Sequence, residues 1–282
     1  MADPRTLSAV SGEAVPPSAS VAPAPSSTPV VVPRLPGTPD LTSEGLYVFS
    51  GGGIELAVDP TNARVRRLAL DGKNAVIPAA DSPGNFTAEL EGSTLVLKGA
   101  LGQRTKRFRL DTARRSVEVT YTLTNETTET TRHTGLSDVY RVPSAGGLTF
   151  FPGAPQSLVG STLKLNVWQR MVWFSHDQAR EPKALEASFD STEGWVASVS
   201  DGLVLVTVFG ETQKPFVKLA SAYDATTKQR PWVEIEQTAV VDLSPGSSMT
   251  TTVRLFLRKL PPSIAAKPGN QELVGFVRGI IQ

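Results

Sequence analysis

The sequence has no cysteine among its 282 residues, which excludes disulfide frameworks, thiol nucleophiles and cysteine-ligated zinc. It contains only two histidines, His133 and His176. There is no run of about 18 apolar residues, so no membrane-spanning helix is expected. The 28 basic and 27 acidic residues leave a net charge of +1. Because nucleic-acid-binding proteins usually carry a clear basic excess, nucleic acid is not an expected partner.

Several catalytic and repeat signatures are also missing. The sequence contains no Gly-x-Ser-x-Gly elbow, no phosphate loop and no His-Glu-x-x-His motif. It has no internal repeat of fixed period, which argues against a propeller. His176 beside Asp177 is too little for a transition-metal site, and no cofactor is predicted. Bound calcium stays open, because its oxygen ligands leave no compact signature outside the EF-hand pattern.

The first 40 residues contain nine prolines, many Ala, Ser and Val, and no aromatic residue. Such a segment buries too little apolar surface to offset the entropy lost on ordering, so residues 1–43 are predicted to be a disordered tether. Leaders of this composition often separate a folded domain from a membrane anchor or export signal. We therefore expect a periplasmic or extracellular location, and a cytoplasmic tail of the same composition is the alternative.

From Tyr47 onward the apolar residues mostly alternate with polar ones, as in half-buried strands. The pattern is clear in residues 117–123, and Asp201-Gly202 predicts a tight hairpin turn within residues 194–210. Roughly fourteen to sixteen strands are expected. The sequence thus predicts an all-β fold of two large antiparallel sheets packed face to face over residues 44–260. Residues 261–282 form an appendage, with a short helix expected in 269–282. Two small sandwiches joined near residues 143–160 are the alternative.

The segment 232–262 carries the clearest candidate chemistry. Residues two apart on a strand point the same way, so Glu234 and Glu236 should lie about 6.5–7 Å apart on one face. Either could act as a general base or bind sugar hydroxyls. Trp232 shares that face and could stack on a sugar ring. The competing interpretation is a solvated outer face of an antiparallel strand.

A second candidate group lies in residues 168–177. His176, with Trp173 and Asp177 nearby, could be a general acid of tuned pKa, or a loop residue hydrogen-bonded to Asp177. Trp173 lies in an irregular region suited to a cleft wall, although most tryptophans of an all-β protein fill the core. Arg170 could bind a carboxylate or a sugar hydroxyl.

Three segments resemble the galactose mutarotase-like β-supersandwich superfamily, which includes the aldose 1-epimerases. They are GGIELAVDPTNARVRRLALDGKNAVIP, SVEVTYTLTNETTETTRHTGLSDVYRV and the acid-bearing strand that leads into Leu-Ser-Pro-Gly. The resemblance implies a catalytic base at Glu234 or Glu236, although the family's usual spacing to a following Gln is not kept. The epimerases also place a His shortly before a Tyr-Phe pair, where this sequence has Ser137 and Asp138.

Three functions follow from these observations. The favoured one is a carbohydrate-binding or carbohydrate-associated protein of this superfamily, with a sugar as its ligand. The alternative is an aldose 1-epimerase, in which Glu234 or Glu236 takes the anomeric proton and His176 protonates the ring oxygen. The third is a non-catalytic accessory domain of the cell envelope that contacts another protein.

Overall fold

The computed structural model divides the chain into two units, Met1–Pro33 and Arg34–Gln282. Residues 1–34 of the predicted tether lie outside the described residues, whereas residues 35–43 are described and include a two-residue strand. Some side chains within the described strands, those of His133 and Glu236 among them, are likewise outside the description. The described residues are 35–78, 84–99, 103–134, 139–144, 146–154, 165–176, 185–210, 216–221, 232–238 and 240–282.

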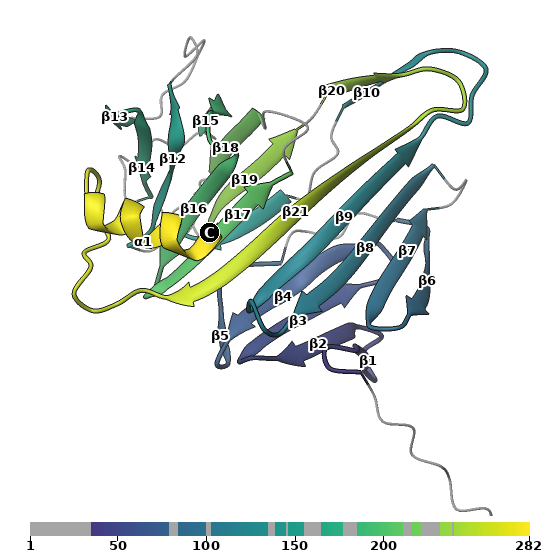
Figure 1. The fold of residues 1–282 in the computed structure, drawn as a ribbon, viewed down its shortest axis with the longest axis horizontal. Coiled ribbons are helices and arrows are strands. Elements are labelled where there is room, and N and C mark those ends of the chain that lie inside the picture. Colours follow the sequence, from purple (N-terminus) through teal and green to yellow (C-terminus); the bar gives the residue numbers. More distant parts are fainter. Residues whose placement is uncertain are drawn as a thin grey trace, which may run out of the picture. The chain divides into compact units, whose positions relative to one another are not determined.

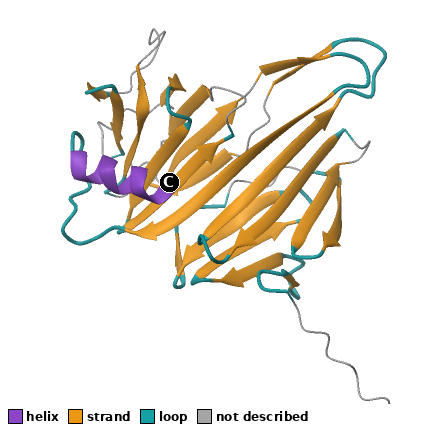
Figure 2. Ribbon diagram, in the orientation of Figure 1, coloured by secondary structure: helices purple, strands orange, loops and turns teal. Residues whose placement is uncertain are grey.

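The described part of the chain forms antiparallel sheets and one C-terminal helix, which confirms the predicted all-β sandwich (Figure 2). The small sheet follows chain order: β1 (Asp40–Leu41), β2 (Tyr47–Gly51), β3 (Ile54–Asp59), β4 (Arg64–Leu70) and β5 (Lys73–Asn74). The large sheet has the order β11 (Val139–Pro143), β19 (Trp232–Thr238), β18 (Phe216–Ser221), β15 (Leu185–Ser191), β12 (Leu148–Ala154), β16 (Trp195–Ser200), β17 (Leu203–Phe209), β21 (Ser248–Lys259), β9 (Ser116–Thr124), β8 (Arg104–Asp111), β7 (Thr94–Gly99) and β6 (Phe86–Glu91). Beside β12 lie β14 (Met171–Ser175) and β13 (Asn166–Trp168), and a separate pair joins β10 (Thr131–Thr134) to β20 (Val240–Leu243).

Local sequence rules account for the best-defined strands. In β9 the buried and half-buried residues alternate, with Val117, Val119 and Tyr121 inside, as the period-two pattern predicts. The predicted hairpin forms between β16 and β17, where Asp201 and Gly202 have φ angles of 52° and 72°. Positive φ at both central residues matches the right-handed twist of the flanking strands, which is why an Asp-Gly pair serves here.

Two apolar clusters lie on opposite faces of the large sheet. The sandwich core lies between the sheets and includes Phe49 and Leu56 of the small sheet and Leu97, Phe108 and Leu205 of the large one. The helix core covers the other face and includes Phe150, Trp173, Trp195, Leu273 and Val277. We call this second face the outer face. Alternation along β12 and β16 divides neighbouring residues between the two clusters.

Helix α1 (Gln271–Ile281) lies on the outer face of the large sheet, where it is drawn in yellow in Figure 1. Asn270 caps its first turn, because its side-chain oxygen accepts a hydrogen bond from the backbone N–H of Glu272. Arg278 in the last turn forms an ion pair with Glu193, between β15 and β16. No helix in the described part of the chain is long and apolar enough to cross a membrane.

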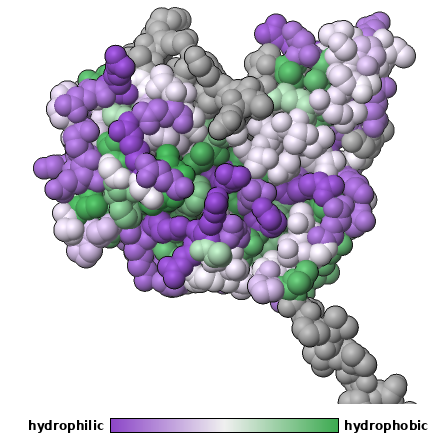
Figure 3. Space-filling view, in the orientation of Figure 1, coloured by the Kyte–Doolittle hydropathy of each residue, from purple (hydrophilic) through white to green (hydrophobic). Residues whose placement is uncertain are grey.

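Beyond the helix, the outer face is polar, and Figure 3 shows mostly pale and purple side chains over β8 and β9. Two threonine pairs bridge β9 and β21, Thr120 with Thr252 and Thr122 with Thr250. Arg109 of β8 forms an ion pair with Glu118 of β9. These exposed groups agree with a solvated sheet surface.

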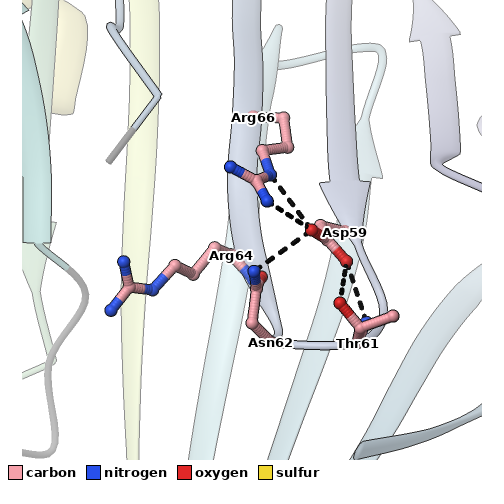
Figure 4. A network of polar contacts seen from close by, with 5 residues as sticks. All are labelled: Asp59, Thr61, Asn62, Arg64 and Arg66. Carbon is pink, nitrogen blue, oxygen red and sulfur yellow. Dashed lines mark hydrogen bonds and ion pairs between the residues drawn. The ribbon is translucent and has the colours of Figure 1, made fainter. Parts of the chain in front are cut away.

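A buried carboxylate organises the turn between β3 and β4 (Figure 4). One oxygen of Asp59 accepts hydrogen bonds from the backbone N–H and hydroxyl of Thr61. The other accepts from the amide of Asn62 and the guanidinium of Arg66. Burial by itself raises the pKa of Asp59, but the hydrogen bonds from Thr61 and Arg66 outweigh burial and hold the pKa below its ordinary value.

Candidate functional site

The candidate acid-bearing strand is β19, and its two faces differ sharply. Val233 and Ile235 are buried in the sandwich core. Trp232 and Glu234 alternate with them and are half-buried on the outer face. Glu236 pairs in register with Val139 and Lys218 of the neighbouring strands, and its side chain lies outside the description. The strand thus presents Trp232 and Glu234 to the outer face.

Arg141 of β11 completes this group, which we call the β11–β19 cluster: Arg141, Trp232 and Glu234. In the antiparallel register Arg141 lies opposite Glu234, and Pro143 lies opposite Trp232. The Nε of Arg141 donates a hydrogen bond to Oε2 of Glu234 over 2.9 Å. The guanidinium carbon lies 4.1 Å from the centre of the Trp232 ring, within cation–π distance.

Sequence reasoning missed Arg141. Alternation in the segment VYRVP places Arg141 and Val142 on opposite faces of one strand, and this signal could have identified Arg141 as a surface cation. Its partner could not be read from the sequence, because Arg141 and Glu234 are 93 positions apart. Their meeting depends on the register between two strands that are distant in the chain.

His176 lies on the other side of the sheet. It is only 3 % exposed, and its Nε2 lies 2.8 Å from the hydroxyl of Thr149. Its Nδ1 lies 3.3 Å from the backbone carbonyl oxygen of Pro143. Thr149 also contacts the hydroxyl of Ser198. On β16, Ser198 lies two positions from Val196, so the two residues share a face, and Val196 belongs to the sandwich core. The structure therefore does not bring His176 to the face that carries Glu234. The expected neighbour Asp177 lies outside the described residues.

Gly147 makes room for the His176 ring. A Cβ atom placed on Gly147 would lie 2.1 Å from Nδ1 of His176, closer than real Cβ contacts allow. The backbone N–H of His176 also donates to the carbonyl of Gly147. His176 is thus held from three sides, by Gly147, Thr149 and Pro143.

The other two candidate binding residues lie apart from the β11–β19 cluster. Trp173 is fully buried in the helix core and stacks on Phe150, with ring centres 4.8 Å apart. Arg170 is exposed at the tight turn between β13 and β14, where it and Gln169 both have positive φ angles. Trp173 therefore packs as a core residue, the alternative that the sequence left open, and Arg170 shapes a hairpin turn.

The remaining sequence candidates are described only in part. His133 pairs with Val241 between β10 and β20, and nothing is described of its side chain. Ser137 and Asp138 lie outside the described residues. Within the described part of the chain, no three carboxylate or imidazole side chains gather as metal ligands.

Comparison with known proteins identifies the fold. No protein-family model and no curated protein matches the sequence. Solved structures do match: a candidate aldose 1-epimerase from Escherichia coli has a TM-score of 0.57 at 12% identity, over 76% of this chain and 99% of that one. Galactose 1-epimerase from Lactobacillus acidophilus has a TM-score of 0.52 at 9% identity, over 77% and 95%. An aldose epimerase homologue from C. elegans also scores 0.52, at 10% identity, over 77% and 99%.

These matches identify the fold class of the chain. The chain has the galactose mutarotase-like β-supersandwich fold, as the three sequence segments indicated. At this level of identity the likeness concerns the fold, and function has to be argued from the residues of the site.

Proposed function

We propose that this chain is a carbohydrate-binding protein of the mutarotase-like fold and that it holds its ligand at the β11–β19 cluster. The observation that carries the proposal is the fixed arrangement of Arg141 between Glu234 and Trp232 on the outer face. Sugar sites combine an aromatic surface, which contacts C–H groups, with charged groups that bind hydroxyls. The cluster holds both elements on two neighbouring strands.

The cluster is suited to binding because its geometry is preorganised. The ion pair uses the Nε of Arg141, so the two terminal nitrogens have N–H groups that a sugar oxygen could accept from. Glu234 keeps a second carboxylate oxygen, Oε1, as an acceptor for a sugar hydroxyl. Because the ion pair and the ring contact already hold these side chains, little side-chain entropy remains to be lost when a ligand binds.

The same geometry favours binding over epimerisation. A general base must reach the proton that it abstracts, and a general acid must reach the same sugar from its other side. Glu234 forms an ion pair with Arg141 on the outer face, whereas His176 is buried on the side of the sandwich core. An epimerase would need Glu236 or another acidic residue as its general base or general acid.

Binding is tested by isothermal titration with a panel of mono- and oligosaccharides, on the full chain and on Trp232→Ala and Arg141→Gln variants. We expect saturable heat for at least one sugar and at least a tenfold loss of affinity in both variants. Arg109→Gln is the matched control, because Arg109 forms a similar ion pair on β8, away from the cluster. A flat response to every sugar would reject the proposal and favour an accessory domain that contacts another protein.

Catalysis is tested separately by polarimetry on fresh α-glucose and α-galactose. A binding protein leaves the rate of mutarotation at its uncatalysed value. A catalysed rate that Glu234→Gln or Glu236→Gln abolishes would instead establish an epimerase.

The proposed location is periplasmic or extracellular. The proline-rich first 40 residues support it, since they suit a spacer between a folded domain and an anchor or signal. Fractionation of the producing cells with an antibody against the folded domain tests the location, and recovery in the cytoplasm would reject it.

A further inference from the structure

A cavity of about 260 Å³ lies between the end of the small sheet and the β16–β17 hairpin. Leu203, Leu205 and Val142 form apolar walls, and Ser198 and Ser200 of β16 contribute hydroxyl groups. The volume is far more than one water molecule needs and just below the usual range of small-molecule sites, which begins at about 300 Å³. The cavity is therefore of a size for one small organic molecule.

The hydroxyl of Ser200 gives the first sign of a ligand. Ser200 is 9 % exposed, and among the described residues its Oγ has no hydrogen-bond partner. Buried hydroxyls nearly always have a hydrogen-bond partner, because a hydroxyl that loses its hydrogen bonds to water without forming new ones destabilises the folded state. An unpartnered hydroxyl in a cavity wall indicates a group that binds there from outside the chain.

A chain of hydrogen bonds fixes the polarity of the second hydroxyl. The Nδ1 of His176 faces the carbonyl oxygen of Pro143, which can only accept, so in the neutral imidazole Nδ1 carries the proton. Nε2 then accepts from the hydroxyl of Thr149, and the Thr149 oxygen in turn accepts from Ser198. Ser198 thus donates its hydroxyl proton to Thr149, and its oxygen can only accept a further hydrogen bond.

The two serines together favour a ligand group that can both donate and accept a hydrogen bond. The acceptor at Ser198 needs a donor, and the hydroxyl of Ser200 can donate to an acceptor. An alcohol hydroxyl meets both needs with one oxygen. Charged ligands are disfavoured, because the buried part of the wall supplies only hydroxyls and apolar side chains, and an unpaired charge there would lose its hydration.

The rim of the cavity shows where a ligand enters. Asn74 and Asp201 are the exposed lining residues, and Asp201 forms an ion pair with Lys73 over 2.8 Å. The side-chain oxygen of Asn74 is already bound to the backbone N–H groups of Leu68 and Val76, which holds the β5 side of the rim in place. The entrance therefore lies between the β4–β5 turn and the β16–β17 turn.

We propose that this cavity is a binding site for a small neutral alcohol or diol, whose hydroxyl bridges Ser198 and Ser200 and whose carbon chain contacts Leu203 and Leu205. The site is independent of the proposed sugar site, since Ser198 and Ser200 face the sandwich core and the β11–β19 cluster faces outward.

The test is a titration of the ¹⁵N-labelled full chain with 1,2-butanediol, followed by the amide resonances of Ser198, Ser200 and Leu203. We expect saturable shifts at these residues, and no saturable shifts with butylammonium or butyrate. Ser200→Ala should weaken binding by about tenfold, the effect of one hydrogen bond. Ser200→Val should abolish binding, because its second methyl group also fills the cavity.

Thermal unfolding without ligand distinguishes a binding role from a structural one. Ser200→Ala removes an unpartnered hydroxyl and should raise the Tm or leave it unchanged. Ser191→Ala is the control, because the Ser191 hydroxyl bonds both backbone groups of Trp195, so its loss should lower the Tm and leave diol binding intact. Unchanged affinity in Ser200→Val, equal binding of the charged probes, or an ordered water on both serines that the diol does not displace would overturn the proposal.

Discussion

Arg141 and Glu234 form an ion pair across β11 and β19 in which both side chains are half-buried, with exposed fractions of 20% and 22%. The guanidinium of Arg141 also lies over the ring of Trp232. Such a pair is worth more than an ion pair at the open surface, where solvent and salt screen the attraction. We therefore expect the pair to stabilise the edge of the large sheet beside the proposed sugar site.

The contribution of this pair to stability is measurable. We expect Glu234→Gln to lower the free energy of unfolding by about 1 kcal/mol, because the neutral amide leaves the half-buried charge of Arg141 unbalanced. Urea unfolding of the single and double variants with Arg141→Gln gives the coupling between them. The more exposed pair Arg109–Glu118 is the control and should show a smaller coupling. Equal couplings would contradict the importance given to burial.

The close contact at Gly147 predicts a strong effect from one added carbon. Gly147→Ala should destabilise the protein by about 1–3 kcal/mol, because the new methyl group overlaps the ring of His176. Removing the ring with His176→Ala should make the second substitution much less costly, which a double-mutant cycle by chemical unfolding would show. Gly275→Ala is the matched control: nothing lies near its Cβ position in α1, so it should stabilise by about 0.5–1 kcal/mol. A harmless Gly147→Ala would contradict the described position of His176.

The Asp59 turn predicts a pH dependence of stability. The folded-state pKa of Asp59 is lowered, so its stabilisation is complete above the ordinary pKa of an aspartate, about 3.9, and is lost as the pH falls through the folded value. Asp59→Asn should cost roughly 2 kcal/mol at pH 7. The difference between the two proteins should stay constant down to about pH 4 and shrink below it. Urea unfolding at a series of pH values measures this, and a difference that grows on acidification would contradict the lowered pKa.

The helix core predicts that α1 stabilises the folded sheet. Leu273→Ala should lower the free energy of unfolding by about 2–5 kcal/mol, because it leaves a space against the outer face. Arg278→Ala, which removes only an exposed ion pair, should cost less than about 1 kcal/mol. Chemical unfolding compares the two. Similar small losses would mean that α1 contributes little to the fold.

The sequence by itself determined the features that depend on near neighbours. The alternation in residues 117–123 predicts the two faces of β9, and Asp201-Gly202 predicts the hairpin of β16 and β17, because strand period and turn geometry are local properties. The short helix expected within residues 269–282 also rests on a local pattern, and the structure has α1 there.

Only the tertiary structure decided which candidates share a site. Strand periodicity placed Trp232, Glu234 and Glu236 on one face, but it could not say that the face looks outward or that Arg141 lies opposite Glu234. The side of the sheet on which His176 lies, and the burial of Trp173 beneath α1, depend on contacts between segments far apart in the chain. Register and face are set by the packing of whole sheets, and one residue of slip would reverse every side chain on a strand.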